Sequence, residues 1–212
     1  MGNKKFISFR TKPRNPVKTV EWFQYFAQLE GQNYNQVSYK NGEKVHPVRE
    51  TYVKLAHPEV NFEETLDPES NARQEKAIYE LLGFAYVDRN GIINVTKAGE
   101  EILKNKDKRD ELMLRQLLKY QYPNYVNSTS RYKNMNVFLM EVVLQMLDKL
   151  DYLSRYESAI SLMFCCHYKE IPRAIEVVKE YRKRVEMKDN KKKRTMKLIF
   201  KKLAEEYYPN VS

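Results

Sequence analysis

The segment from Leu82 to Leu103 constrains the fold most strongly, because it combines a helix stop with a tight turn. Gly83 has no Cβ and can take the left-handed conformation that closes a helix. Residues 84–88 and 92–96 then read as two strands. Between them, Asn90-Gly91 can supply the two positive φ angles that a type I′ turn requires. The segment therefore predicts a helix followed by a β hairpin.

A second helix is expected directly after this hairpin, since Thr96 can cap a helix that begins at Lys97. Helix, tight hairpin and helix is the order of elements in a winged-helix unit, which uses a helix and a β wing to contact nucleic acid. The same order also occurs in ordinary α+β packing. The segment alone leaves both interpretations open.

Helix-start signals recur in the first half of the chain. Asn15-Pro16 and Asp67-Pro68 each place a capping side chain before a proline at the first helical position, and Pro47 opens a shorter helix through about Ala56. The polar stretch 32–44, with a turn at Asn41-Gly42, is expected to be a loop or a short hairpin. The helix before the central hairpin is the candidate recognition helix.

The second half of the sequence predicts helices only. Apolar residues recur at helical spacing, and Ser154 is placed to cap a helix after a turn near Leu153. Residues 150–164 could form a second helix-turn-helix, although no wing follows it. The predicted fold is mainly α with a small β hairpin, in tandem winged-helix or helix-turn-helix-like subdomains. We expect the first at residues 1–106 and the second, all-helical one at 107–212, with the charged segment 104–110 between them.

Composition excludes several classes of protein. A hydrophobic share of 42% is too high for a disordered chain, and no apolar run approaches the roughly 20 residues that cross a bilayer. The polar N-terminus shows no signal segment, so we expect a cytoplasmic protein without a membrane partner. Cys165 and Cys166 are adjacent and are expected to be buried thiols rather than a disulfide or zinc site. We assign no metal to the scattered histidines.

The formal charge of +10 is concentrated at the two ends of the chain. Residues 1–20 carry six bases and no acid, and residues 182–202 carry eleven bases against two acids. Two basic ends on a slightly acidic body indicate a surface that binds phosphates. The alternative is that these runs are solvated tails that keep the protein soluble.

Catalytic signals are weak. Glu186-Met187-Lys188 matches the Glu-x-Lys half of a metal-dependent nuclease site, but no Pro-Asp lies suitably upstream, and we treat the match as chance. The acidic stretch 58–71 is expected to be a solvated loop rather than a metal or acid–base site. No glycine-rich phosphate loop is present. We predict no catalytic residue and no metal ligand in this chain.

Four ordered segments carry a resemblance to a known family. Lys12–Lys18 is similar to a Ser-Pro-Arg segment, with Lys12 in place of the serine. Gly83–Gly99 is close to a GF(x)n-ITxAG pattern. Leu114–Pro123 resembles LxKQLLKxQxP, with arginine for the first lysine, and Leu153–Glu157 matches LSKxE with the same exchange. Together they resemble the N-terminal DNA-recognition region of AlwI-type type IIS restriction endonucleases and their site-specific nicking relatives.

This resemblance implies a sequence-specific double-stranded DNA-binding module that reads a short asymmetric site. Cleavage would be performed by a separate C-terminal domain or catalytic subunit, which we expect to be absent here and to use magnesium; the module itself would need no cofactor and act as a monomer. One alternative is a complete nuclease with an unrecognised metal site. The other is a winged-helix transcription regulator, which would bind a palindrome as a dimer.

The expected DNA contacts are side chains that can bind phosphates or read base edges. They come from the basic arm, the helix before the hairpin, the hairpin tip and later loops. They are Lys12, Arg14, Asn15, Lys18, Arg73, Gln74, Lys76, Arg89, Asn90, Arg115, Lys119, Arg131, Lys133, Lys191, Lys192 and Arg194.

Overall fold

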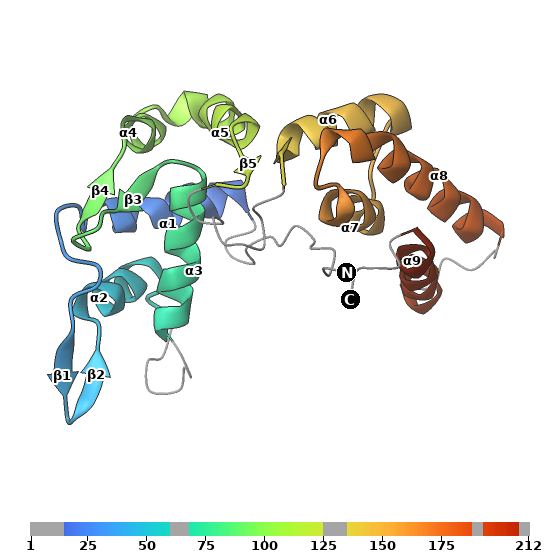
Figure 1. The fold of residues 1–212 in the computed structure, drawn as a ribbon. Coiled ribbons are helices and arrows are strands. Elements are labelled where there is room, and N and C mark those ends of the chain that lie inside the picture. The colour runs from blue at the N-terminus through green and yellow to red at the C-terminus, as the bar shows by residue number, and fades with distance from the viewer. Residues whose placement is uncertain (1–14, 60–67, 125–134, 188–192, 208–212) are drawn as a thin grey trace. The chain divides into compact units, whose positions relative to one another are not determined.

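The computed structural model describes residues 15–59, 68–124, 135–187 and 193–207, which form mainly helices with small antiparallel strand pairs (Figure 1). This agrees with the mainly α prediction. The chain divides into two compact units, with the change from one to the other at Leu117–Leu118. Within the described ranges, every helix is too short or too polar to cross a bilayer.

The first unit contains α1 to α5 and two β hairpins. Its elements in chain order are α1 Pro16–Ala27, β1 Ser38–Lys40, β2 Glu43–Val45, α2 Pro47–Ala56, α3 Pro68–Leu81, β3 Ala85–Val87, β4 Ile93–Val95, α4 Lys97–Lys104, the short 3-10 helix η1 Lys106–Lys108 and α5 Arg109–Leu118. The segment where the sequence predicted a boundary therefore holds η1 and the start of α5. Met113 of α5 packs into the core of this first unit.

The helix signals read from the sequence are confirmed at several ends. The Asn15 side chain accepts a hydrogen bond from the Val17 amide at 2.9 Å, and Thr96 accepts one from Gly99 at 3.1 Å. Gly83, two residues after the end of α3, has a φ of 67°, as a helix-closing glycine requires. The Asp67 cap predicted for α3 lies outside the described residues.

Two hairpins share an Asn-Gly dipeptide but use different turns. In the β1–β2 hairpin, Asn41 and Gly42 both have positive φ, at 51° and 83°. Around Asn90-Gly91 only Gly91 does, at 83°, so the type I′ turn predicted between β3 and β4 is wrong. The reason is Asp88, whose carboxylate accepts the amides of Asn90 (2.9 Å) and Ile92 (2.8 Å) and closes a three-residue loop with Gly91 as its left-handed residue.

An aromatic core joins α1, α2 and α3. Phe23, Phe26, Tyr52, Tyr79 and Phe84 are fully buried, and their rings contact one another in tilted or edge-on pairs. Such rings bury large apolar areas with defined geometry. They fix the orientation of α3, the helix that was predicted to face DNA.

A polar network lies inside this core. Glu75 of α3, only 1% exposed, accepts a hydrogen bond from the Tyr52 hydroxyl, and its carboxylate lies 2.9 Å from His57 Nε2. Tyr52 in turn lies 2.7 Å from the Tyr79 hydroxyl. Burial raises the pKa of both phenols well above the usual value, so both stay protonated. The network ties α2 to α3 through groups that would be costly to leave unpaired.

The second unit is not entirely helical, contrary to the sequence prediction. Its elements are β5 Gln121–Tyr122, β6 Val137–Phe138, α6 Leu139–Leu150, α7 Arg155–Phe164, the short 3-10 helix η2 Tyr168–Glu170, α8 Ile171–Met187 and α9 Lys193–Tyr207. Val137 and Phe138 continue the apolar pattern of α6, yet they pair antiparallel with Tyr122 and Gln121. The buried Tyr122 and Val137 side chains favour this short pair over another helical turn.

The turn between α6 and α7 is held by a partly buried ion pair, Arg182–Glu157. Ser154 is the helix cap, as predicted, and Glu157 completes it: the Glu157 carboxylate accepts the Ser154 amide at 2.6 Å, and Ser154 Oγ accepts the Glu157 amide at 3.4 Å. Arg182 of α8 donates to Glu157 at 2.7 Å and to the Leu150 carbonyl at 2.9 Å. Burial opposes ionisation of Glu157, but the bonds from Arg182 and Ser154 outweigh it and lower its pKa. Cys165 and Cys166 are buried, as predicted, and are not joined in a disulfide.

Replacing Glu75 by alanine is expected to lower the free energy of unfolding by about 3 kcal/mol, because the variant leaves Tyr52 and His57 buried without their acceptor. Urea denaturation followed by circular dichroism measures this. Glu101→Ala, at an exposed position of α4, is the control and should change stability by less than about 0.5 kcal/mol. Equal stability of the two variants would remove Glu75 from this role.

Replacing Glu157 by glutamine is expected to destabilise the second unit at neutral pH and to reduce its sensitivity to acid. Since the pKa of Glu157 is lowered by folding, its contribution is present above the usual glutamate pKa of about 4.3 and is lost as the pH falls through the lower folded value. At neutral pH the urea midpoint of wild type should therefore exceed that of the variant. At acidic pH the two midpoints should converge. The control is Glu176→Gln, at an exposed position of α8, which should have the wild-type midpoint at both pH values. A midpoint difference between wild type and Glu157→Gln that is the same at both pH values would contradict the role assigned to Glu157.

Candidate nucleic-acid interface

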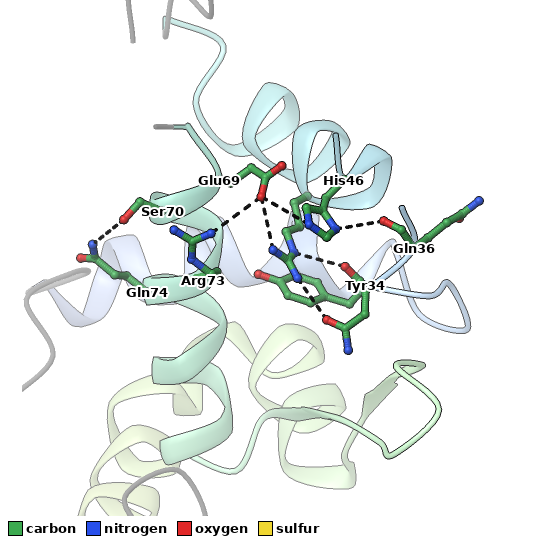
Figure 2. Close-up of polar contacts among 9 residues, drawn as sticks. Tyr34, Gln36, His46, Glu69, Ser70, Arg73 and Gln74 are labelled. Atoms are coloured by element: carbon green, nitrogen blue, oxygen red, sulfur yellow. Dashed lines mark hydrogen bonds and ion pairs between the residues drawn. The ribbon is translucent and has the colours of Figure 1, made fainter. Parts of the chain in front are cut away.

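Three cationic or ionisable side chains meet at one carboxylate at the start of α3 (Figure 2). Oε2 of Glu69 lies 3.3 Å from Arg49 Nη1, 3.7 Å from Arg73 Nη1 and 3.9 Å from His46 Nε2. His46 directly precedes α2, Arg49 belongs to α2, and Arg73 is one turn along α3 from Glu69. We call these four residues the Glu69 cluster. It joins α2 and α3 on the surface, beside the buried Glu75 network.

Arg49 is the fixed member of the Glu69 cluster. Its side chain is 11% exposed, it donates to the Tyr34 carbonyl at 3.3 Å and to Asn35 Oδ1 at 3.1 Å, and its guanidinium lies 4.8 Å from the centre of the Tyr34 ring. Burial also raises the pKa of the Tyr34 phenol. A cation with this many partners serves as scaffold, and it holds Glu69 in place.

Arg73 is the exposed member. Half of its side chain is open to solvent, while Glu69 remains 21% exposed beneath it. Two guanidinium groups share one carboxylate, so the cluster keeps a net positive charge. A guanidinium held on a helix surface can donate in parallel to a phosphate or to the edge of a guanine.

Gln74 and Lys76 are less exposed than the outward-facing positions that the sequence predicted. Gln74 is partly buried and donates to Ser70 Oγ at 3.2 Å. Lys76 is 23% exposed and pairs at 2.8 Å with Glu80, which also accepts the Val87 amide at 3.2 Å. The pair joins α3 to β3, because this side of α3 packs against the hairpin. A DNA contact by either residue stays a prediction.

The other described residues that were predicted to contact DNA are exposed, but they lie on separate elements of the first unit or just after α5. Arg89 and Asn90 form the tip of the β3–β4 hairpin. Lys18 lies on α1, 5.8 Å above the Trp22 ring, and Asn15 is occupied as the helix cap. Two further exposed side chains are Arg115, which pairs with Glu111 at 2.5 Å, and Lys119.

Seven predicted contacts cannot be placed in this surface. Lys12, Arg14, Arg131, Lys133, Lys191 and Lys192 lie outside the described residues, and Arg194 belongs to α9 but its side chain is not described. Lys188 of the Glu-x-Lys match and the acids between residues 60 and 67 also lie outside. In the ranges that are described, no three His, Cys, Asp or Glu side chains gather where they could hold a metal ion.

Sequence reasoning missed Arg49 and His46. Arg49 follows the Pro47 helix signal, but the sequence did not show that Glu69 would lie opposite it across two helices. Residues 32–44 were predicted to be a loop or short hairpin, but their exposed side chains Tyr39, Lys40 and Lys44 were not considered as contacts. A tyrosine between polar residues beside an Asn-Gly turn was the available signal.

Comparison with known proteins supplies the family. The model of the AlwI restriction endonuclease family matches residues 80–209. The match begins in the last turn of α3 and includes the β3–β4 hairpin and the described elements of the second unit. A search of curated proteins gave no match. Because the matched region covers more than half of the 212 residues, this chain belongs to the AlwI restriction endonuclease family.

Proposed function

We propose that this chain is the sequence-specific DNA-recognition module of a type IIS restriction or nicking endonuclease. In this proposal α3, the β3–β4 hairpin and α4 act as a winged-helix-like unit, and the module reads a short asymmetric site in double-stranded DNA as a monomer. Membership of the AlwI restriction endonuclease family supports DNA as the partner.

The observation that carries the proposal is the placement of Arg73. Glu69, which pairs with Arg49 at 3.3 Å, lies 3.7 Å from Arg73, and half of the Arg73 side chain stays exposed on α3. A helix with such an arginine can enter the major groove and donate two hydrogen bonds to one base. We assign base readout to Arg73, and phosphate contacts to the hairpin tip at Arg89 and Asn90 and to the start of α1.

The second unit would supply a further contact surface around the α6–α7 turn. Its Ser154–Glu157 cap and Arg182 fix that turn rigidly, which a helix-turn-helix element requires. This explains the family resemblance at residues 153–157 in structural terms. Glu157 is buried and paired, so it stabilises the fold, and DNA contacts would come from neighbouring cationic side chains.

Cleavage is assigned to another domain or subunit. Magnesium-dependent hydrolysis requires carboxylates that converge on the ion, and the described residues offer no cluster of three His, Cys, Asp or Glu groups for it.

Selection from a pool of random-sequence duplexes with the purified chain tests the proposal. The expected result is enrichment of one asymmetric site of about five base pairs. A palindrome would favour a dimeric regulator instead, and no enrichment would contradict sequence-specific recognition. Incubation of the same preparation with plasmid and magnesium should leave the plasmid intact; site-specific nicking would show that the chain is itself a nuclease.

Replacing Glu69 by glutamine is expected to reduce specificity more than affinity. The variant loses the anion that orients Arg73 and gains one positive charge, so binding to unselected duplex should stay equal or strengthen while preference for the selected site falls about tenfold. Fluorescence anisotropy with both duplexes at one salt concentration measures the ratio.

Glu100→Gln provides the matched control. It breaks an i,i+4 pair of the same kind, with Lys104 at 2.8 Å on α4, and changes the net charge equally. Its specificity ratio should equal that of wild type. If both variants lose specificity to the same degree, the effect is one of net charge and Glu69 does not position Arg73.

A further inference from the structure

The β1–β2 hairpin carries an exposed aromatic side chain that the fold does not use. The hairpin extends away from α2 and α3 (Figure 1), and its tight turn is fixed by positive φ at Asn41 and Gly42. Tyr39 is 75% exposed, the highest value among the exposed large hydrophobic side chains of the described residues. Lys40 and Lys44 are exposed beside it. An exposed aromatic ring beside a lysine is a combination of side chains suited to nucleic acid.

The register of the hairpin separates its two faces. Tyr39 is directly opposite Lys44, so these side chains share one face, whereas Lys40 is opposite Glu43. Among the described residues, no acid forms an ion pair with Lys44. The Tyr39–Lys44 face therefore presents an aromatic ring and a positive charge together, and the other face is close to neutral.

The base of this hairpin is attached to the Glu69 cluster. His46, the residue after β2, lies 3.0 Å through Nδ1 from the Gln36 carbonyl before β1, and its Nε2 lies 3.9 Å from Glu69. Figure 2 shows His46 between Gln36 and Glu69, with Arg73 on the other side of the carboxylate. The hairpin and the exposed guanidinium of α3 are thus fixed to one another through a single cluster.

We propose that the Tyr39–Lys44 face is a second DNA-contacting element, which binds the duplex beside the base pairs that Arg73 reads. Lys44 contacts a backbone phosphate, and the Tyr39 ring packs on sugar and base edges of the adjoining groove. The inference rests on the proposed function. A second copy of the chain is disfavoured as occupant, because pairing two such hairpins would bring their lysines together.

The test compares Tyr39→Ala and Lys44→Gln in the full chain, using the selected duplex and anisotropy titrations over a series of salt concentrations. Tyr39→Ala is expected to weaken binding about tenfold with an unchanged salt slope, since packing of the ring on sugar and base edges neutralises no phosphate and releases no counterion. Lys44→Gln is expected to reduce the salt slope by about one. Both residues are exposed, so thermal unfolding should match wild type.

Lys40→Gln and Leu55→Ala are the controls. Lys40 is exposed on the other face of the same hairpin, and Leu55 is a 38% exposed side chain of α2; both variants should bind as wild type. If wild type binds duplex while Tyr39→Ala and Lys44→Gln bind equally well, the hairpin inference fails and the proposed function stands. If wild type binds no duplex, the proposed function itself fails. A dimer of wild type that Tyr39→Ala dissociates in sedimentation equilibrium would assign the face to a second copy.

Discussion

The shared carboxylate of Glu69 connects the parts of the first unit on which the functional account depends. Arg49 from α2, Arg73 from α3 and His46 from the base of the β1–β2 hairpin all meet it within 3.9 Å. Partly exposed ion pairs of this kind contribute at most about 1 kcal/mol to stability. The cluster therefore matters chiefly because it positions side chains: the partly buried Arg49 holds the Glu69 carboxylate, and that carboxylate orients the exposed Arg73.

Stability comes from groups deeper in each unit. Several of these groups belong to the four segments that resemble the AlwI family, which gives those segments a structural role. Gly99 of the second segment sits so close to β3 that a Cβ would lie 2.1 Å from the Phe84 carbonyl oxygen and 2.9 Å from the Phe23 ring. Thr96 Oγ1 donates to the Gly83 carbonyl at 2.6 Å. Glu157 of the fourth segment is enclosed by Ser154 and Arg182. These residues hold the scaffold, so the readout of a particular site falls to exposed side chains beside them.

Local signals were read from the sequence more reliably than pairings across the chain. Asn15, Gly83 and Thr96 act through neighbours within a few residues, and their helix ends were predicted correctly. The Asn90-Gly91 turn was misassigned because the Asp88 side chain competes for the loop amides. Lys76 was predicted to face outward, since the sequence does not show Glu80 and β3 beside it. The contacts of Glu69 span two helices and follow only from the packing of the aromatic core.

The central claim is that Arg73 reads sequence from α3. It is tested most directly by measuring affinity for duplexes in which single base pairs of the selected site are exchanged. Each base pair of the selected site is exchanged in turn, and the loss of affinity is measured for wild type and for Arg73→Ala. If Arg73 reads sequence, the variant loses discrimination at one base pair, by about 1–3 kcal/mol, and keeps it elsewhere. A uniform loss of affinity with every preference intact would contradict it and make Arg73 a phosphate contact.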